Sequence, residues 1–258
     1  MKISAYLITK NEEKRLAATL NAVSQVADEI IIVDSGSTDK TEEIAKQFGA
    51  KFIFREWIGY ANQKNYAQNQ CQYDWLLSVD ADEVLSDDLI KEINFLKNTK
   101  PEYQVYNVKI GDMYKGFKAP KKLSKKYNII RFYHKKYATM KANLLTEDRI
   151  SLTQNVKIGQ LKGLIHHYSF LNISHQISKF NQYTDEVILT AKKKKKHYSA
   201  FRLATEFPRQ FFIYYFKKRQ FCNGFWGFIV SMNSAYARFL KIAKYIEKER
   251  NEKCQKSV

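Results

Sequence analysis

The 258-residue chain is poor in residues that break or cross-link a backbone, with three cysteines, three prolines and nine glycines. Cys71, Cys222 and Cys254 are odd in number and lie far apart, which argues against a disulfide framework or a zinc site and favours a reducing compartment. Long apolar runs are lacking as well, because the longest late stretch, Phe225 to Met232, contains a glycine and a serine. The sequence therefore predicts no secretory leader and no membrane-spanning helix, and we expect a cytoplasmic protein.

Charge is distributed unevenly along the chain. Apolar residues make up 45% of the sequence, enough for an ordinary core, so disorder throughout is excluded. Residues 1–100 hold 12 lysines and arginines against 16 aspartates and glutamates, a net charge of −4, whereas residues 101–258 hold 32 against 10, a net charge of +22. The acidic front suits a metal-dependent catalytic core. The basic rear predicts a polyanionic partner: nucleic acid, an anionic membrane surface or a phosphorylated substrate.

The first hundred residues alternate between short apolar runs and segments with helical spacing. Such alternation predicts an α/β fold with a mostly parallel sheet flanked by helices, in which ligands bind beyond the carboxyl ends of the strands. Asp34 and Asp80 both follow predicted strands, and Asn11 is a candidate cap for the first helix. The predicted strands of this part are Ile3 to Thr9, Glu29 to Val33, Lys51 to Arg55 and Trp75 to Val79.

Beyond residue 100 the pattern is less regular. Two more strands are predicted, at Tyr103 to Ile110 and at Asn128 to Tyr133. From Ile173 onward the sequence indicates helices, and the last of them carries an apolar stripe that includes Ala235 and Ile242. The fold is therefore expected to end in a basic, mostly helical extension.

Asp80 and Asp82 are two carboxylates separated by one residue at the end of an apolar strand. They lie on the same side of the chain and could share one hard divalent cation, which would stabilise a diphosphate leaving group. On spacing alone, a polar turn that caps the following helix explains the pair equally well. The apolar strand before the pair favours the metal site.

Four ordered motifs resemble the family 2 glycosyltransferases, which have the GT-A fold. The resemblance extends to the branch that builds the lipopolysaccharide core, and segments around residues 166–169 and 218–227 carry it over nearly the whole chain. It implies a nucleotide-sugar-binding half at residues 1–100, an acceptor-binding half at 101–170, and a membrane-surface extension at 171–258. The motifs are ITKNEE at 8–13, IIVDSGSTD at 31–39, WIGY at 57–60 followed by QKN at 63–65, and DADE at 80–83.

The resemblance also implies roles for individual residues and a divalent cation, manganese or magnesium, as cofactor. A carboxylate can accept the imide N–H of uracil, and a lysine can supply a positive charge beside a diphosphate. Simpler explanations exist for some of these side chains: a strand-end hydroxyl, a solvated helix charge or a helix cap, the last of which we prefer for Asp39. The implied roles are the nucleotide site for Thr9 and Glu13, the base for Asp34, the diphosphate for Lys64, the ribose side for Asp80 and the metal for Asp82.

An inverting transfer needs a general base that deprotonates the acceptor hydroxyl. Glu147 is the candidate because it lies where the similar branch carries a His-Glu pair, although Thr146 replaces that histidine. Alternatively, Asp148 is the working carboxylate while Glu147 forms an ion pair with Arg149 or Arg131.

His167 lies in a His-Tyr-Ser segment that matches the same branch. It is a candidate ligand of the metal or of the donor phosphates. A histidine at a strand end is, however, more often simply hydrogen-bonded.

The leading hypothesis is an inverting transferase that moves a hexose, glucose from UDP-glucose, onto a heptose of a lipopolysaccharide or lipooligosaccharide inner core. The phosphorylated, lipid-anchored acceptor would meet the basic rear at the inner face of the cytoplasmic membrane, where the aromatic and basic stretch Phe211 to Arg219 suits the interface. Alternatively, these aromatics belong to the core and the lysines form only a solvated face. A different sugar donor or a polysaccharide acceptor remains an alternative. A nucleic-acid-binding protein would explain the charge but not Asp34, Asp80 and Asp82, so no nucleic-acid partner is expected.

Overall fold

The computed structural model describes residues 1–140, 149–193 and 198–255, and its chain divides into two compact units. Unit 1 comprises Met1–Met113 and Lys126–Tyr168, and unit 2 comprises Tyr114–Lys125 and Ser169–Val258. Each unit is described by itself below. The assignment of a donor half and an acceptor half to residues 1–100 and 101–170 stays a prediction.

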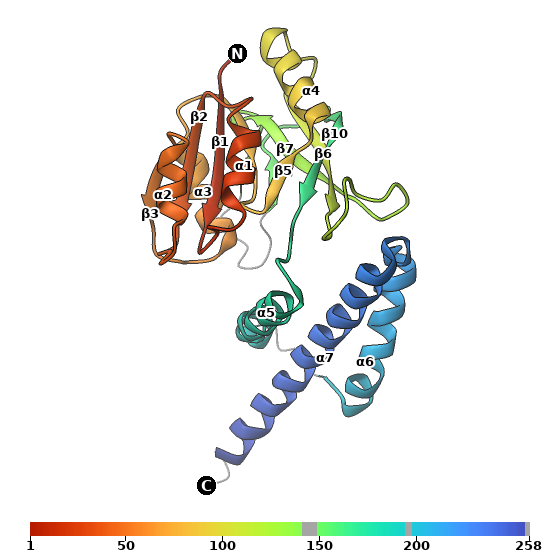
Figure 1. Cartoon of the computed structure of the whole chain (residues 1–258). Helices are drawn as coiled ribbons and strands as arrows, with labels where there is room; N and C mark the ends of the chain where they lie inside the picture. Colours follow the sequence, from red (N-terminus) through yellow and green to blue (C-terminus); the bar gives the residue numbers. More distant parts are fainter. Residues whose placement is uncertain (141–148, 194–197, 256–258) are drawn as a thin grey trace. The chain divides into compact units, whose positions relative to one another are not determined.

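Unit 1 is built on an eight-stranded sheet with the order β3-β2-β1-β4-β7-β6-β10-β5 (Figure 1). The strands β3, β2, β1 and β4 are parallel, β7 is antiparallel to β4 and β6, β10 is parallel to β6, and β5 is antiparallel to β10. A separate antiparallel pair is formed by β8 (Ala138–Met140) and β9 (Ile150–Leu152). The strands of the large sheet are β1 (Ile3–Thr9), β2 (Glu29–Asp34), β3 (Lys51–Phe54), β4 (Trp75–Ser78), β5 (Glu83–Leu85), β6 (Val105–Asp112), β7 (Tyr127–His134) and β10 (Gly159–His167).

Helices cover both faces of this sheet because its strands alternate their apolar side chains. In β1, Leu7 packs with residues of α1 (Leu16–Val23), α2 (Thr41–Gln47) and α4 (Asp87–Asn98), whereas Tyr6 packs with residues of α3 (Tyr60–Asn69). Buried apolar side chains on both faces explain why the parallel strands read as nearly continuous apolar runs. The predicted α/β fold, with a mostly parallel sheet flanked by helices, is confirmed.

Local interactions set the ends of several helices. The Ser86 hydroxyl caps α4 by accepting a hydrogen bond from the backbone N–H of Leu89 at 3.3 Å. The prediction for Asn11 was wrong: α1 begins at Leu16, and Asn11 has a φ of 54° and accepts a hydrogen bond from the backbone N–H of Thr38. Asn11 therefore joins the loops that follow β1 and β2.

A close contact between α4 and β10 requires a glycine. A Cβ atom added to Gly163 would lie 2.4 Å from the backbone of Leu89, so no other residue fits without a shift of the helix. The carboxylate of Glu92 accepts hydrogen bonds from the backbone N–H groups of Lys162 and Gly163 at the same contact. This packing fixes β10, whose last residue is His167.

The described residues of unit 2 are mainly helical from Ile173 onward, as the sequence predicted. The last helix buries Ala235 and Ile242 of the predicted stripe. No helix in the described part of the chain is both long and apolar enough to cross a membrane. The helices are α5 (Ile173–Lys193), α6 (Ala200–Phe212), the π-helix η1 (Ile213–Lys217), the 3-10 helix η2 (Gln220–Asn223) and α7 (Gly224–Gln255).

Candidate active site

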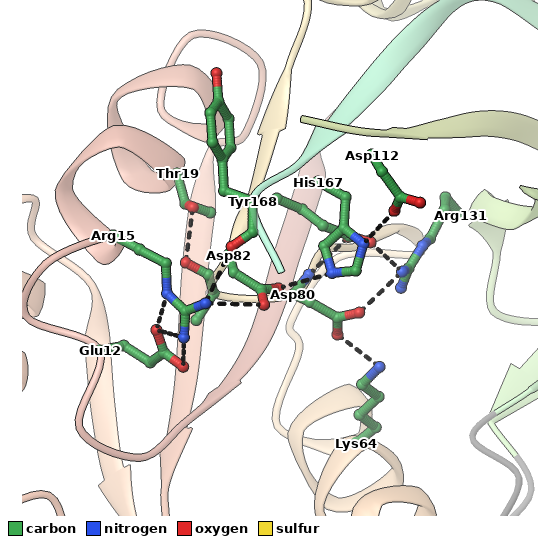
Figure 2. Close-up of polar contacts among 12 residues, drawn as sticks. Glu12, Arg15, Thr19, Lys64, Asp80, Asp82, Asp112, Arg131, His167 and Tyr168 are labelled. Atoms are coloured by element: carbon green, nitrogen blue, oxygen red, sulfur yellow. Dashed lines mark hydrogen bonds and ion pairs between the residues drawn. The ribbon is translucent and has the colours of Figure 1, made fainter. Parts of the chain in front are cut away.

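Strand register brings the acidic loop after β4 to the carboxyl end of β10. Glu83, the first residue of β5, pairs with His167, the last residue of β10, and the backbone N–H of Tyr168 donates to the carbonyl of Asp82 at 2.8 Å. Helix α1 supports the loop from the other side, because the Thr19 hydroxyl donates to the carbonyl of Ala81 at 2.9 Å. The side chains of Asp80, Asp82 and His167 consequently lie in one cluster (Figure 2).

Asp80 is held by two cations. Its Oδ1 lies 2.6 Å from the ammonium of Lys64 on α3, and its Oδ2 lies 3.0 Å from Nη2 of Arg131 on β7. Burial alone would raise the pKa of the Asp80 carboxyl, but the two cations outweigh it and hold that pKa well below its usual range. Asp80 is therefore a fixed negative charge that positions Lys64.

Arg131 also binds Glu83, which is almost completely buried. Its Nη2 lies 2.6 Å from Oε1 of Glu83, and Oε2 of Glu83 accepts a hydrogen bond from the backbone N–H of Asp80 at 2.9 Å. Burial raises the pKa of Glu83 against the opposing effect of Arg131. The guanidinium thus ties β7 to both ends of the acidic loop.

Asp82 faces His167. Its Oδ1 lies 3.4 Å from Nε2 of His167, while Nδ1 of the same imidazole lies 3.5 Å from Oδ1 of Asp112 at the end of β6. Burial disfavours the imidazolium, but the hydrogen bonds to Asp112 and Asp82 outweigh it and raise the pKa of His167 to about 10. A metal binds only the neutral imidazole, so a cation held by Asp82 and His167 would have to displace this proton.

Arg15 and Glu12 complete the cluster from the loop that precedes α1. Nη1 of Arg15 lies 3.3 Å from Oδ2 of Asp82 and donates to the carbonyl of Tyr168 at 3.0 Å. Glu12 holds the guanidinium through two hydrogen bonds, to Nε at 2.8 Å and to Nη2 at 2.7 Å. Arg15 therefore orients one oxygen of Asp82 and leaves the other toward His167.

The donor chemistry around Asp82 fits a cation that takes most of its ligands from a substrate. In the part of the chain that the structure describes, no group of three or more His, Cys, Asp or Glu side chains could hold a metal by itself. One carboxylate and one imidazole nevertheless face each other at 3.4 Å, and Mg²⁺ is commonly bound by one or two carboxylates together with substrate phosphates. Asp82 and His167 fit that type of site, whereas both oxygens of Asp80 bind basic side chains.

Thr9 and Asp34 form a second cluster at the ends of β1 and β2. They are register partners, and the Thr9 hydroxyl donates to Oδ2 of Asp34 at 2.8 Å. Oδ1 of Asp34 accepts hydrogen bonds from the backbone N–H groups of Gly36 at 2.8 Å and Ser37 at 2.7 Å, and the Ser37 hydroxyl donates to Oδ2 at 2.5 Å. The buried Asp34 carboxylate thus shapes the loop after β2, where Gly36 has a φ of 89°. A role in binding the base stays a prediction.

Helix α3 links the two clusters through consecutive residues. The Gln63 amide donates to the Ser35 hydroxyl at 3.1 Å, while Lys64 reaches Asp80. Glu13, which precedes α1 in sequence, belongs to neither cluster. Its carboxylate lies near the start of α2 and accepts a hydrogen bond from the backbone N–H of Lys40 at 3.3 Å. Asp39 accepts hydrogen bonds from the backbone N–H of Thr41 and from its hydroxyl, but the cap residue of α2 is Lys40, so Asp39 binds the first turn from one residue before the cap position.

The two candidate bases, Glu147 and Asp148, lie outside the described residues. Of the other candidates, Lys64, Asp80, Asp82 and His167 are brought together, and Thr9 and Asp34 form the neighbouring cluster. Sequence reasoning missed the roles of Arg15, Glu83 and Arg131. Arg131 had a visible signal, a single charge inside the strand-like run Asn128 to Tyr133, but the sequence suggested it only as an alternative partner of Glu147 and did not indicate Asp80 or Glu83.

Comparisons with known proteins identify the family of the chain and several relatives. The family model described as Glycosyl transferase family 2 matches residues 4–153. An uncharacterized glycosyltransferase of Rickettsia typhi is 40% identical over 254 residues, covering 95% of this chain and 87% of its own. The lipopolysaccharide core biosynthesis glycosyltransferase LpsC of Rhizobium meliloti is 28% identical over 258 residues, covering 96% and 93%.

Among solved structures, residues 1–349 of TarS from S. aureus match with a TM-score of 0.47 and 14% identity, covering 96% of this chain and 92% of that one. The family model spans more than half of the chain, and the relative from R. typhi is similar along nearly all of it. The chain is therefore a glycosyltransferase that belongs to glycosyl transferase family 2.

Proposed function

We propose that this glycosyltransferase moves glucose from UDP-glucose, with inversion, onto a heptose of a lipopolysaccharide or lipooligosaccharide inner core. A divalent cation, manganese or magnesium, would be held by Asp82 and His167 and would neutralise the diphosphate as it leaves. The observation that carries the proposal is the pairing of Asp82 with His167 at the carboxyl edge of the sheet, beside Lys64.

The chain's own residues divide the work at the donor. Lys64 is held by Asp80 and supplies a positive charge for a phosphate oxygen without having to be ordered on binding. Arg15 and Asp112 keep Asp82 and His167 oriented toward each other. Thr9 and Asp34 fix the loop after β2, beside which the uracil and ribose would lie. Glu147 or Asp148 would remove the proton from the acceptor hydroxyl.

The acceptor class is supported by the relative from R. meliloti, whose name assigns it to lipopolysaccharide core biosynthesis. The net charge of +22 on residues 101–258 suits a phosphorylated acceptor. Because such an acceptor is anchored by its lipid, the enzyme would work as a peripheral protein on the inner face of the cytoplasmic membrane.

Mass analysis of the core oligosaccharide tests the proposal. In cells that lack this gene, we expect the core to be shorter by one hexose, and a plasmid copy of the gene should restore it. A plasmid that encodes Asp82→Asn should not restore it, because the carboxylate that would hold the cation is lost. An unchanged core in cells without the gene, or one that has lost a sugar other than a hexose, would refute the assignment.

A further inference from the structure

Helix α6 exposes large apolar side chains along one side. Phe201 and Phe212 are 78% and 60% exposed, and the exposed Ala204 and Pro208 lie between them at helical spacing. Phe216 continues the same line into η1 with an exposed fraction of 53%. Three exposed rings along α6 and η1 are unusual for a surface that faces only water.

Three of the exposed rings contact one another in sequence order. Phe212 and Phe216 are stacked with their centroids 5.5 Å apart, and Phe216 lies 6.5 Å from Phe221 of η2. The chain can turn back in this way because Gly227 of α7 lets the carbonyl of Gln220 approach, a position where a Cβ atom would lie 1.8 Å from that oxygen. We call Phe201, Phe212, Phe216 and Phe221 the aromatic ridge.

A row of arginines flanks the aromatic ridge. Arg202 follows Phe201 and Arg209 follows the exposed Pro208, and both arginines bind the buried carboxylate of Glu206, at 3.6 Å and 3.0 Å. Arg238 of α7, which packs beside α6 (Figure 1), reaches the same carboxylate at 3.2 Å. One carboxylate thus holds three half-exposed guanidiniums in place, which leaves an excess of two positive charges.

The charge around the ridge has one sign. Between residues 200 and 230 the sequence contains five basic residues and one acidic residue, the buried Glu206. Lys217 and Arg219 are exposed at the end of η1, close in sequence to Phe216 and Phe221. Exposed rings that lie next to basic side chains match a bilayer interface, where rings sit at the depth of the headgroups and cations meet lipid phosphates.

We propose that the aromatic ridge and its arginine row bind the surface of a bilayer that contains anionic phospholipid. Phe212, Phe216 and Phe221 enter the headgroup region, and Arg202, Arg209 and Arg238 bind lipid phosphates, oriented by Glu206. Only the reason for membrane binding rests on the proposed function, because an enzyme with a lipid-anchored acceptor meets that acceptor at a membrane. The surface itself is argued from exposure, ring contacts and charge.

Cosedimentation of the full chain with vesicles tests this proposal. We expect binding to vesicles of phosphatidylethanolamine and phosphatidylglycerol, and at least about tenfold weaker partitioning to phosphatidylcholine alone. The double variant Phe212→Ser/Phe216→Ser should lose about tenfold or more of the partitioning. Arg202→Gln, which leaves Arg209 and Arg238 on Glu206, should lose about fivefold on anionic vesicles only.

The matched control is Phe95→Ser, because Phe95 is also highly exposed, at 68%, but lies on α4, a helix that contains no arginine. This variant should bind vesicles as the unchanged protein does. Circular dichroism of each variant checks that the helices are retained. Equal binding by all the variants, or binding to RNA and not to vesicles, would overturn the proposal. UDP binding is measured in a separate experiment. A protein that does not bind vesicles therefore leaves the transferase proposal intact, and a protein that does not bind UDP leaves the membrane-binding proposal intact.

Discussion

Replacing Asp82 with asparagine should lower the kcat/KM of sugar transfer by about 10² to 10³-fold or more. The amide has the size of the carboxylate and can still accept hydrogen bonds, but it lacks the charge that faces His167 at 3.4 Å and Arg15 at 3.3 Å. The backbone hydrogen bond from Tyr168 to the carbonyl of residue 82 does not depend on the side chain, so the loop should keep its conformation. The measurement is the initial rate of transfer with saturating manganese.

Asp74→Asn is the matched control for that experiment. Asp74 precedes β4 at the opposite end from Asp82, is largely exposed, and pairs with Lys135 at 3.0 Å. The same chemical change at that position should leave the rate unchanged. If Asp82→Asn kept at least half of the activity while remaining folded, the proposed metal position would be wrong.

Replacing Arg131 with methionine should lower the free energy of unfolding by about 3–5 kcal/mol. The guanidinium of Arg131 and the carboxylate of Glu83 are both buried and lie 2.6 Å apart. Removing the guanidinium leaves the buried Glu83 without this partner. Asp80 then keeps Lys64 as its nearest cation. Methionine retains most of the volume, so the loss reports charge pairing more than packing. Urea unfolding measures the change.

Two comparisons sharpen the Arg131 prediction. The double variant Arg131→Met/Glu83→Gln should recover part of the loss, because the uncompensated charge is removed together with its partner. Lys46→Met breaks the exposed pair with Glu42, and we expect a change within about 0.5 kcal/mol. An Arg131→Met protein as stable as Lys46→Met would show that the buried ion pair does not stabilise the sheet.

The alternation of strands and helices was predictable because the central parallel strands β1, β2 and β4 are buried on both faces. Ile3–Thr9 forms β1 with the predicted bounds, and β4 ends at Ser78, one residue before the predicted end. The antiparallel insertion of β7 between β4 and β6 could not be predicted, since it depends on pairing between strands far apart in sequence. Asn11 shows the limit of local rules, because its side chain binds the loop after β2 instead of a helix.

The candidate site was predictable where a residue type and its motif coincide. The pair Asp80 and Asp82 falls at a strand end, as proposed, but the two carboxylates have different partners: Asp80 binds Lys64 and Arg131, and Asp82 faces His167. The spacing of the two carboxylates in the sequence predicted one shared role. In the structure, the pairing of the strands places them beside different partners. The contacts of Arg131 arise because β7 lies beside β4, which no local pattern encodes.

The measurement that tests the account most directly is calorimetric titration of UDP into the purified full chain, with manganese and then with a chelator. Asp82→Asn and Asp74→Asn serve as the variant and its control. The account predicts that UDP binds in the presence of manganese and that affinity falls by about 10 to 100-fold or more with the chelator or in Asp82→Asn, but not in Asp74→Asn. UDP affinity that is the same with and without manganese, and in both variants, would contradict it.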